Sequence, residues 1–376
     1  PENSMPMSSP RKLTSALLLA ALVFPISAHA GLYGFDEAHP YTPEEKLLSI
    51  DVPPHSIKNY RDLLRENIIA LSNYAKANRP DFQIMVHEGQ DLLTRSLWEY
   101  HLDGYLKARN NGEDVSDPSF LLNLKQTSPE FEPLVGGRSA EYLKSIDAVV
   151  VNNHFCQKLP LNPVIVQNGI KAFSVDLCPD GRAFDRAISA SLKEKIPFYG
   201  FLRSNKAFRK IAAQPIIKEN AENIFDLKSA QNISFLLKDD LYADKNDFIE
   251  AVRASNYDVV VIEPYFRQRQ PFTPEEINAM KYKKNGTRRQ LLARFSVTEA
   301  KDTDYYWNNS WKIGSPDWLV RASFVEPRGV ITRYWDNEWK NYMSRYFQGI
   351  IKSGYDGAFL TGLENHRYFE NLTPLE

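Results

Sequence analysis

Short runs of apolar residues recur along this sequence, separated by longer stretches in which apolar residues fall at helical spacing. This alternation is typical of βα units around a parallel sheet. Eight runs are predicted to be strands: residues 82–86, 148–152, 198–202, 233–237, 258–263, 291–297, 330–334 and 358–361. Helices are predicted at residues 60–77, 185–194, 246–254 and 338–352, and Gly354 follows the last of them as a capping glycine does.

Eight parallel strands with intervening helices favour a closed (β/α)8 TIM-type barrel over an open sheet. No linker rich in Pro, Gly or Ser divides the chain after its first segment, so residues 31–376 are predicted to be one barrel domain. In such barrels the chemistry lies at the carboxyl ends of the strands. Polar residues that close an apolar run are therefore the candidates for a site.

The first 30 residues have the pattern of a signal peptide. Arg11 and Lys12 precede an apolar run at residues 13–23, and Ala28-His29-Ala30 gives a small-x-small cleavage pattern. The run is too short to cross a bilayer, and no later segment reaches the roughly 20 apolar residues that a membrane helix needs. We expect an exported protein, secreted or periplasmic, without a membrane span.

Charge and cysteine content narrow the function further. A formal net charge of -1 and a pI of about 6.8 give no basic footprint for nucleic acid. Cys156 and Cys178 could pair in an oxidising compartment, the alternative being two separate buried thiols. No residues show metal-ligand spacing, and we expect neither a metal site nor a cofactor.

Four carboxylates close or follow apolar runs: Glu88, Glu263, Glu299 and Glu364. Most glycosidases need two carboxyl groups at the scissile bond, one as acid and one as nucleophile or base. A single Glu at such a place is more often solvated or ion-paired, so it is the joint placement of four that favours catalysis. His87 is interpreted as a hydrogen-bonded residue at a strand end rather than a ligand or acid.

Aromatic residues are dense between residues 305 and 339. Core packing accounts for part of this density, and stacking on sugar rings is the alternative for the rings nearest Glu299. The candidates for sugar binding are Tyr306, Trp307 and Trp335.

Several segments together resemble one enzyme family. They are Leu-Leu-Ala-Arg-Phe-Ser-Val-Thr-Glu-Ala at residues 291–300, Asp-Tyr-Tyr-Trp at 304–307, Arg-Tyr-Trp-Asp at 333–336 and Gly-Tyr-Asp-Gly-Ala-Phe-Leu at 354–360. Their order and spacing resemble the endo-alpha-1,4-polygalactosaminidase family, glycoside hydrolase family 114, over residues 256–364. The resemblance implies an extracellular barrel that acts on a galactosamine-containing polysaccharide.

Two earlier segments, 82–89 and 146–151, resemble strands that come late in that family. The resemblance therefore implies a circularly permuted barrel in which the strand near Phe82 lies beside the strand near Ala358. New termini at a loop are compatible with a closed barrel, whose first and last strands are neighbours.

The chain departs from the family at the two positions that are thought to supply its catalytic pair. Thr361 stands where the family has Asp, and Asn152 and Asn153 stand where a Glu is usual, and none of these side chains can act as acid or base at neutral pH. Glu299 and Glu364 are retained as the expected acid and nucleophile or base, with Glu88 and Glu263 in reserve. Asn152, Asn153 and Asp356 are expected to bind substrate.

The favoured interpretation is an exported glycoside hydrolase acting on a polysaccharide. A sugar-binding barrel that has lost its catalytic pair is the alternative, and a structural protein without a ligand is a third. Few basic residues adjoin the four glutamates in sequence, so we expect a negative groove suited to a cationic polymer. Neither the linkage nor the oligomeric state follows from the sequence.

Overall fold

A parallel sheet of eight strands forms the centre of the molecule. The computed structural model describes residues 56–126, 131–202, 207–211 and 215–375, so the expected signal peptide lies outside the described residues. The sheet order is β4-β3-β2-β1-β13-β9-β6-β5. Its strands are β1 (Gln83–His87), β2 (Ala148–Asn152), β3 (Lys171–Cys178), β4 (Phe198–Leu202), β5 (Ile233–Leu236), β6 (Val259–Ile262), β9 (Gln290–Ser296) and β13 (Gly357–Thr361).

The strands follow one another around the sheet in chain order, which gives a nearly closed TIM-type barrel. β1 pairs with β2 on one side and with β13 on the other, with Gln83 opposite Gly357. The expected contact between the strand near Phe82 and the strand near Ala358 is confirmed. β4 and β5 come close at the two ends of the sheet, although no hydrogen-bonded ladder joins their described residues.

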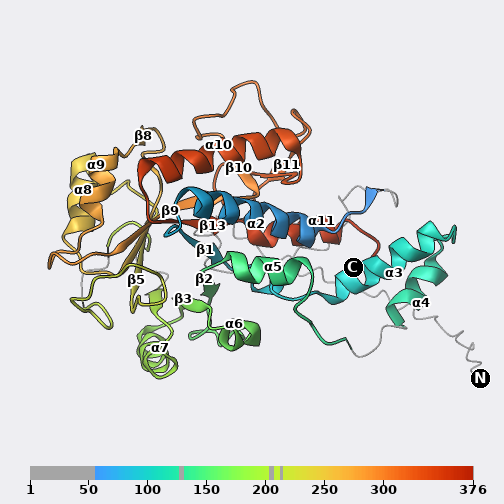
Figure 1. The fold of residues 1–376 in the computed structure, drawn as a ribbon, viewed down its shortest axis with the longest axis horizontal. Helices are drawn as coiled ribbons and strands as arrows, with labels where there is room; N and C mark the ends of the chain where they lie inside the picture. The colour runs from blue at the N-terminus through green and yellow to red at the C-terminus, as the bar shows by residue number, and fades with distance from the viewer. Residues whose placement is uncertain (1–55, 127–130, 203–206, 212–214, 376) are drawn as a thin grey trace, which may run out of the picture.

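Helices surround the barrel (Figure 1). α2 and α10 lie along the same flank and contact each other, and α2 also packs on α5. Asn59 caps the start of α2 and Asp336 the start of α10, which ends at Gly354 with a φ of 97°, as expected. The helices are α2 (Tyr60–Asn78), α3 (Leu97–Asn110), α4 (Pro118–Gln126), α5 (Arg138–Ser145), α6 (Pro163–Gln167), α7 (Gly181–Glu194), α8 (Lys245–Arg253), α9 (Pro274–Met280), α10 (Asn337–Ser353) and α11 (His366–Asn371).

The barrel interior is filled by side chains rather than open. Alternate residues of each strand point inward, and the buried set includes Met85, Val150, Phe173, Phe235 and Phe359. A second cluster of buried residues lies between the strands and the outer helices. Within the described part of the chain, none of the helices has the length and apolarity needed to cross a bilayer.

One of the eight expected strands is wrong. Residues 329–332 do form a strand, β12 (Gly329–Thr332), but it belongs to a small antiparallel sheet with β10 (Glu299–Lys301) and β11 (Leu319–Ala322). The eighth barrel strand is β3, whose outward Ser174 and Asp176 interrupt its apolar pattern. These two side chains are hydrogen-bonded to each other and buried under the loop after β2. The third sheet is a hairpin after β6, made of the two short strands β7 (Tyr265–Phe266) and β8 (Gln270–Pro271).

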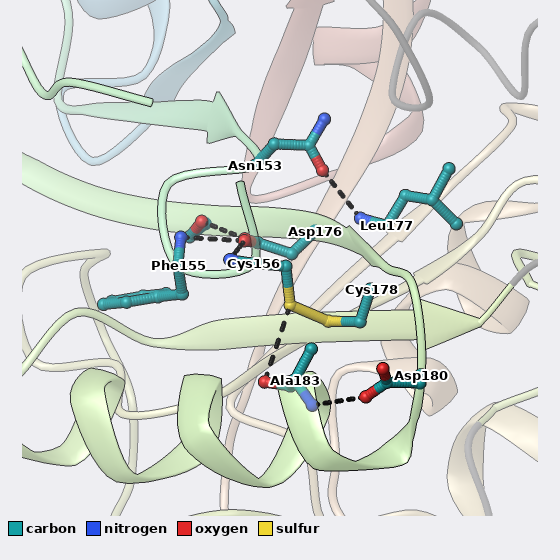
Figure 2. Close-up of a disulfide and its surroundings, with 9 residues drawn as sticks. Asn153, Phe155, Cys156, Asp176, Leu177, Cys178, Asp180 and Ala183 are labelled. Atoms are coloured by element: carbon teal, nitrogen blue, oxygen red, sulfur yellow. Dashed lines mark hydrogen bonds between the residues drawn. A yellow bond between two sulfur atoms is a disulfide. The ribbon is translucent and has the colours of Figure 1, made fainter. Parts of the chain in front are cut away.

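A disulfide attaches the loop after β2 to β3 (Figure 2). Cys156 and Cys178 are bonded across 22 residues of sequence, so the first of the two alternatives is confirmed. Asp176 Oδ2 accepts hydrogen bonds from the backbone N–H groups of Phe155 and Cys156, at 2.8 and 2.6 Å. Asn153 Oδ1 accepts from the N–H of Leu177 at 2.8 Å. Together these bonds fix the loop that begins at Asn152.

Replacing both cysteines by serine is expected to lower the free energy of unfolding by about 3 kcal/mol. The bond closes a loop of 22 residues, and its loss frees the unfolded chain. Urea denaturation followed by circular dichroism measures the change. Reductant should weaken the wild type by a similar amount and leave the double variant unaffected, whereas equal stability of the oxidised wild type and the variant would contradict the prediction.

Candidate active site

The four expected glutamates lie at the carboxyl ends of four adjacent strands. Glu88 follows β1, Glu364 follows β13, Glu299 comes shortly after β9, and Glu263 follows β6. These strands are neighbours in the order β1-β13-β9-β6, and all run in the same direction. The four residues therefore gather on one end of the barrel, where TIM-barrel enzymes carry their active sites.

Glu88 and Asn152 are joined across β1 and β2. The backbone N–H of Asn152 donates to Glu88 Oε1 at 2.7 Å, and Asn152 Oδ1 lies 2.9 Å from His87 Nε2. Glu88 has a φ of 53°, in the left-handed region that non-glycine residues seldom adopt. Such strained backbone is often found at functional sites.

His87 connects this pair to Glu364. Because an amide oxygen only accepts, the contact with Asn152 places the imidazole proton on Nε2, and Nδ1 then faces Glu364 Oε1 at 3.9 Å. Burial lowers the pKa of His87 to about 4, so the ring is neutral at pH 7. The expected assignment of His87 as a hydrogen-bonded residue at a strand end is confirmed.

Burial makes Glu88 and Glu364 unusual acids. It raises the pKa of Glu88 to about 7, an effect opposed by the hydrogen bond from Asn152. It raises the pKa of Glu364 to about 8, and the nearby Glu88 carboxylate adds to the increase. The Glu364 carboxyl group is therefore partly protonated near neutral pH. It is also accessible to solvent, since 32% of its side chain is exposed.

Glu263 is in a different environment, because Arg294 occupies the space beside it. Arg294 Nη1 is 2.8 Å from Glu263 Oε1, and Arg294 Nη2 is 2.5 Å from Glu326 Oε2. Lys301 Nζ lies 3.4 Å from Glu326 and 3.7 Å from Glu263. The expectation of a negative groove is wrong here, since Arg294 and Lys301 balance the carboxylates of Glu263 and Glu326.

Glu299 is buried and held by two neutral donors. Its Oε1 accepts from Ser323 Oγ at 2.7 Å and from Asn365 Nδ2 at 3.0 Å, and the side chain is almost inaccessible. Burial raises the pKa of Glu299, and the Glu326 carboxylate raises it further. Asn365 directly follows Glu364, so this hydrogen bond links Glu299 to the segment that carries Glu364.

A cleft of about 20 Å³ lies beside Glu299, large enough for about one water molecule. Ser296 Oγ lines it and is buried without a hydrogen-bond partner among the described residues. Thr361 pairs with Ser296 across β13 and β9. Its buried hydroxyl also has no hydrogen-bond partner among the described residues. The other lining residues are Glu263, Arg294, Phe295, Lys301, Asp304, Tyr306 and Tyr346.

Among the three aromatic candidates, Tyr306 reaches this cleft. Its hydroxyl donates to Asp304 Oδ2 at 2.7 Å. Trp307 packs edge-on against Trp311, with ring centres 5.4 Å apart. Trp335 packs against Phe369 at 4.7 Å. The packing interpretation thus accounts for Trp307 and Trp335, which are both partly buried.

Two expected substrate-binding residues have structural contacts instead. Asn153 is buried, with a φ of 55°, and its side chain anchors the loop to β3. Asp356 immediately precedes β13 and therefore lies at the opposite end of the barrel. There it pairs with Lys281 at 2.9 Å and with Arg288 at 2.7 Å. Asp356 is therefore not brought together with the four glutamates, whereas Asn153 directly follows Asn152, which bonds to Glu88.

Several residues at this end were not expected from the sequence. Arg294 and Lys301 form the ion pairs with Glu263, and Asp91, His366 and Arg367 form another cluster beside Glu364. Arg294 had a local signal, because an arginine inside the otherwise apolar strand β9 must find a partner when buried. The others lie in loops or short elements without such a signal.

Comparison with known proteins finds relatives but no family. No family model matches this sequence. An uncharacterized protein of Methanocaldococcus jannaschii is 30% identical over 154 residues, which are 40% of this chain and 42% of that protein. Uncharacterized proteins of Deinococcus radiodurans and Thermotoga maritima are each 26% identical, over 33% and 34% of this chain and 38% and 39% of their own lengths. The chain thus spans about two fifths of the curated relatives that it matches.

The raised pKa of Glu364 predicts a stability that falls with pH. Below the ordinary value near 4.5 the carboxyl group is protonated in both the folded and the unfolded chain. Between that value and about 8 the unfolded chain loses the proton first, so the folded state is progressively destabilised as pH rises. Glu364→Gln should remove this loss and be more stable than the wild type at pH 9 by about 1–2 kcal/mol, after allowance for solvent exposure. Urea titrations at pH 4 and pH 9 measure the effect, and stability curves that run parallel for the two proteins would refute it.

Proposed function

We propose that this protein is an exported glycoside hydrolase that cleaves a polysaccharide, with a galactosamine polymer as the candidate substrate. The observation that carries the proposal is the pair Glu88 and Glu364 at the carboxyl ends of β1 and β13, whose pKa values are raised to about 7 and about 8. Two interacting carboxyl groups with different proton affinities are what acid and base catalysis of glycoside cleavage requires.

The environments of the two residues suggest their roles. Glu364 has the higher pKa and the solvent-accessible carboxyl group, so it is the proton donor to the leaving oxygen. Glu88 accepts the N–H of Asn152, a bond that favours its carboxylate form, so it acts as nucleophile or base. This assignment moves Glu88 from reserve to the pair, in place of the more deeply buried Glu299.

Export is proposed on two grounds. The first 30 residues have the pattern of a signal peptide, and the bond between Cys156 and Cys178 suits an oxidising compartment. The galactosamine polymer comes from the resemblance of residues 256–364 to the polygalactosaminidase family.

A sugar-binding protein without catalysis is the second candidate. It is favoured by Asn152 and Thr361, neutral side chains at the positions that correspond to the family's acids. Under this alternative the barrel end would bind glycan through neutral hydrogen-bonding groups and release no product.

Glu364→Gln is expected to lower the rate of polysaccharide hydrolysis at least about a hundredfold, the contribution typical of a general acid. In the wild type, kcat/KM should rise as Glu88 loses its proton near pH 7 and fall as Glu364 loses its proton near pH 8. Reducing-end release from partially deacetylated galactosamine polymer across pH 5 to 10 measures both effects.

The matched control is Glu113→Gln, at an exposed glutamate after α3, which should retain wild-type activity. Full activity in a folded Glu364→Gln variant would remove Glu364 from the mechanism. Binding of the polymer without any product, in the wild type, would establish the second candidate in place of the first.

Substrate charge can be tested separately from catalysis. If free amino groups are recognised by the carboxylates, the partially deacetylated polymer should bind more tightly than the fully acetylated polymer at low salt. The difference should shrink at high salt, since the Debye length falls from about 10 Å at 0.1 M to about 3 Å at 1 M. Affinity electrophoresis of both polymers measures this, and equal affinities at low salt would exclude a cationic substrate.

A further inference from the structure

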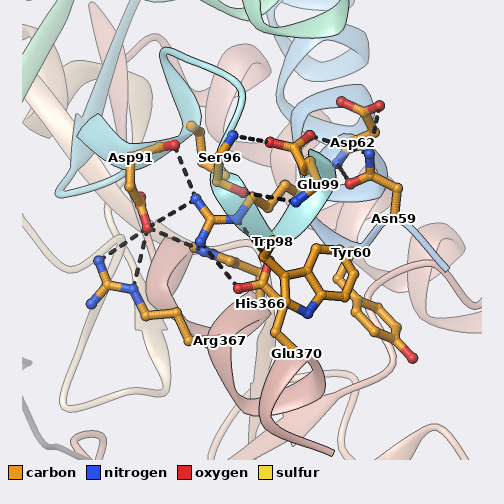
Figure 3. Close-up of polar contacts among 12 residues, drawn as sticks. Asn59, Tyr60, Asp62, Asp91, Ser96, Trp98, Glu99, His366, Arg367 and Glu370 are labelled. Carbon is orange, nitrogen blue, oxygen red and sulfur yellow. Dashed lines mark hydrogen bonds and ion pairs between the residues drawn. The ribbon is translucent and has the colours of Figure 1, made fainter. Parts of the chain in front are cut away.

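Asp91 is the centre of a cluster of basic side chains (Figure 3). Its Oδ2 accepts from Arg367, with nitrogens at 3.0 and 3.2 Å, and lies 3.1 Å from His366 Nε2. Arg61 Nη1 is 3.7 Å from the same oxygen and donates to the Asp91 backbone carbonyl at 3.2 Å. One carboxylate thus holds side chains from both α2 and α11.

The contacts of His366 hold its ring in place. His366 Nδ1 is 2.7 Å from the backbone carbonyl of Leu363, which can only accept, so Nδ1 carries a proton. Nε2, on the other side of the ring, lies 3.1 Å from Asp91 Oδ2. Because His366 is fully buried, its ring joins the turn that contains Leu363 to the segment that contains Asp91.

These contacts join the two loops that carry the glutamate pair. Asp91 lies in the short helix η2 (Gln90–Leu92) just after Glu88, and His366 follows the short helix η3 (Leu363–Asn365) that contains Glu364. Gly89 allows the loops to touch, because a Cβ at this position would lie 2.5 Å from Leu363 Cδ2. The separation of the two carboxyl groups therefore depends on this junction.

We propose that Asp91 is a positioning residue for the Glu88–Glu364 pair. Asp91 binds His366 and Arg367, and so keeps the Arg367 guanidinium from pairing with either glutamate. The role in a reaction rests on the proposed function, whereas the effect of Asp91 on the two carboxyl groups does not.

Electrostatics around the pair support this role. Arg367 favours the ionised form of Glu88 and of Glu364, lowering both pKa values, while Asp91 raises both. If Asp91 loses its charge, the guanidinium keeps its charge but loses its partner, and the two glutamates are the acceptors that remain beside it. Both should then ionise at lower pH, and Glu364 should no longer be a proton donor near neutral pH.

Four other ionisable groups at this end of the barrel are either neutral or have partners of their own. His87 of β1 is neutral, and Arg294 of β9 is bound to Glu263 and Glu326. Tyr142 of α5 donates to the backbone carbonyl of Gly89, and burial raises the pKa of this tyrosine above the physiological range, so it stays neutral. Arg61 of α2 has a second carboxylate partner, Glu370, at 2.7 Å.

The test compares Asp91→Asn with Glu370→Gln in the full chain. Both variants remove one carboxylate from the same network, but Glu370 pairs with Arg61 rather than with Arg367. Carboxyl carbon NMR titrations should show the pKa values of Glu88 and Glu364 lowered by about one unit or more in Asp91→Asn and unchanged in Glu370→Gln. The alkaline limb of kcat/KM should move to lower pH in the first variant alone.

Arg367→Gln gives an independent measurement if Asp91→Asn does not fold. Removing the guanidinium should shift both glutamate pKa values upward, the opposite direction. Unchanged values in folded Asp91→Asn, or an equal shift in Glu370→Gln, would overturn the proposal. Shifted pKa values in a protein that cleaves no polysaccharide would support the role of Asp91 in setting the pair and reject the proposed function.

Discussion

The strands of the barrel all run in the same direction, and the organisation of the candidate site depends on this constraint. Parallel alignment brings the ends of β1, β13, β9 and β6 to one place, together with the ionisable side chains that follow them. Charged groups lose hydration when they are crowded into a protein interior, so each must find a partner of opposite charge or change its protonation.

The molecule uses both solutions on neighbouring strands. Near β6 and β9, Glu263 is paired with Arg294, whose guanidinium also binds Glu326. Despite burial, Arg294 and Lys301 hold the pKa of Glu326 below its ordinary value. Near β1 and β13, the available cation Arg367 is bound to Asp91, and burial raises the pKa values of Glu88 and Glu364. The ion-paired cluster around Glu263 is suited to holding a ligand in place. The Glu88–Glu364 pair is suited to exchanging protons near neutral pH.

The sequence predicted the barrel from local patterns and the site only in outline. Seven barrel strands follow from apolar runs, but β3 does not. Its Ser174 bonds to Asp176, and Asp176 finds its other partners in a loop that the pattern cannot place. The four glutamates could be predicted to lie together because residues that close parallel strands all lie at the carboxyl end of the barrel. Their surroundings could not be predicted, because the partners are distant in sequence: 31 residues separate Glu263 from Arg294, and 276 separate Asp91 from Arg367.

The neutral residues at the strand ends bear on where chemistry can occur. Asn152 uses its side chain to orient His87, whereas Thr361 and Ser296 have buried hydroxyls without a partner among the described residues. A buried polar group without a hydrogen bond costs roughly 1–3 kcal/mol of stability. Thr361 and Ser296 lie side by side on β13 and β9, and water or a ligand hydroxyl that completed their hydrogen bonds would remove this cost. The ionisable pair lies one to three residues beyond the strand ends, in the loops. The strand ends would thus bind the ligand, and the loops would supply the protons. This division of roles differs from that of a barrel whose acids lie on the strands themselves.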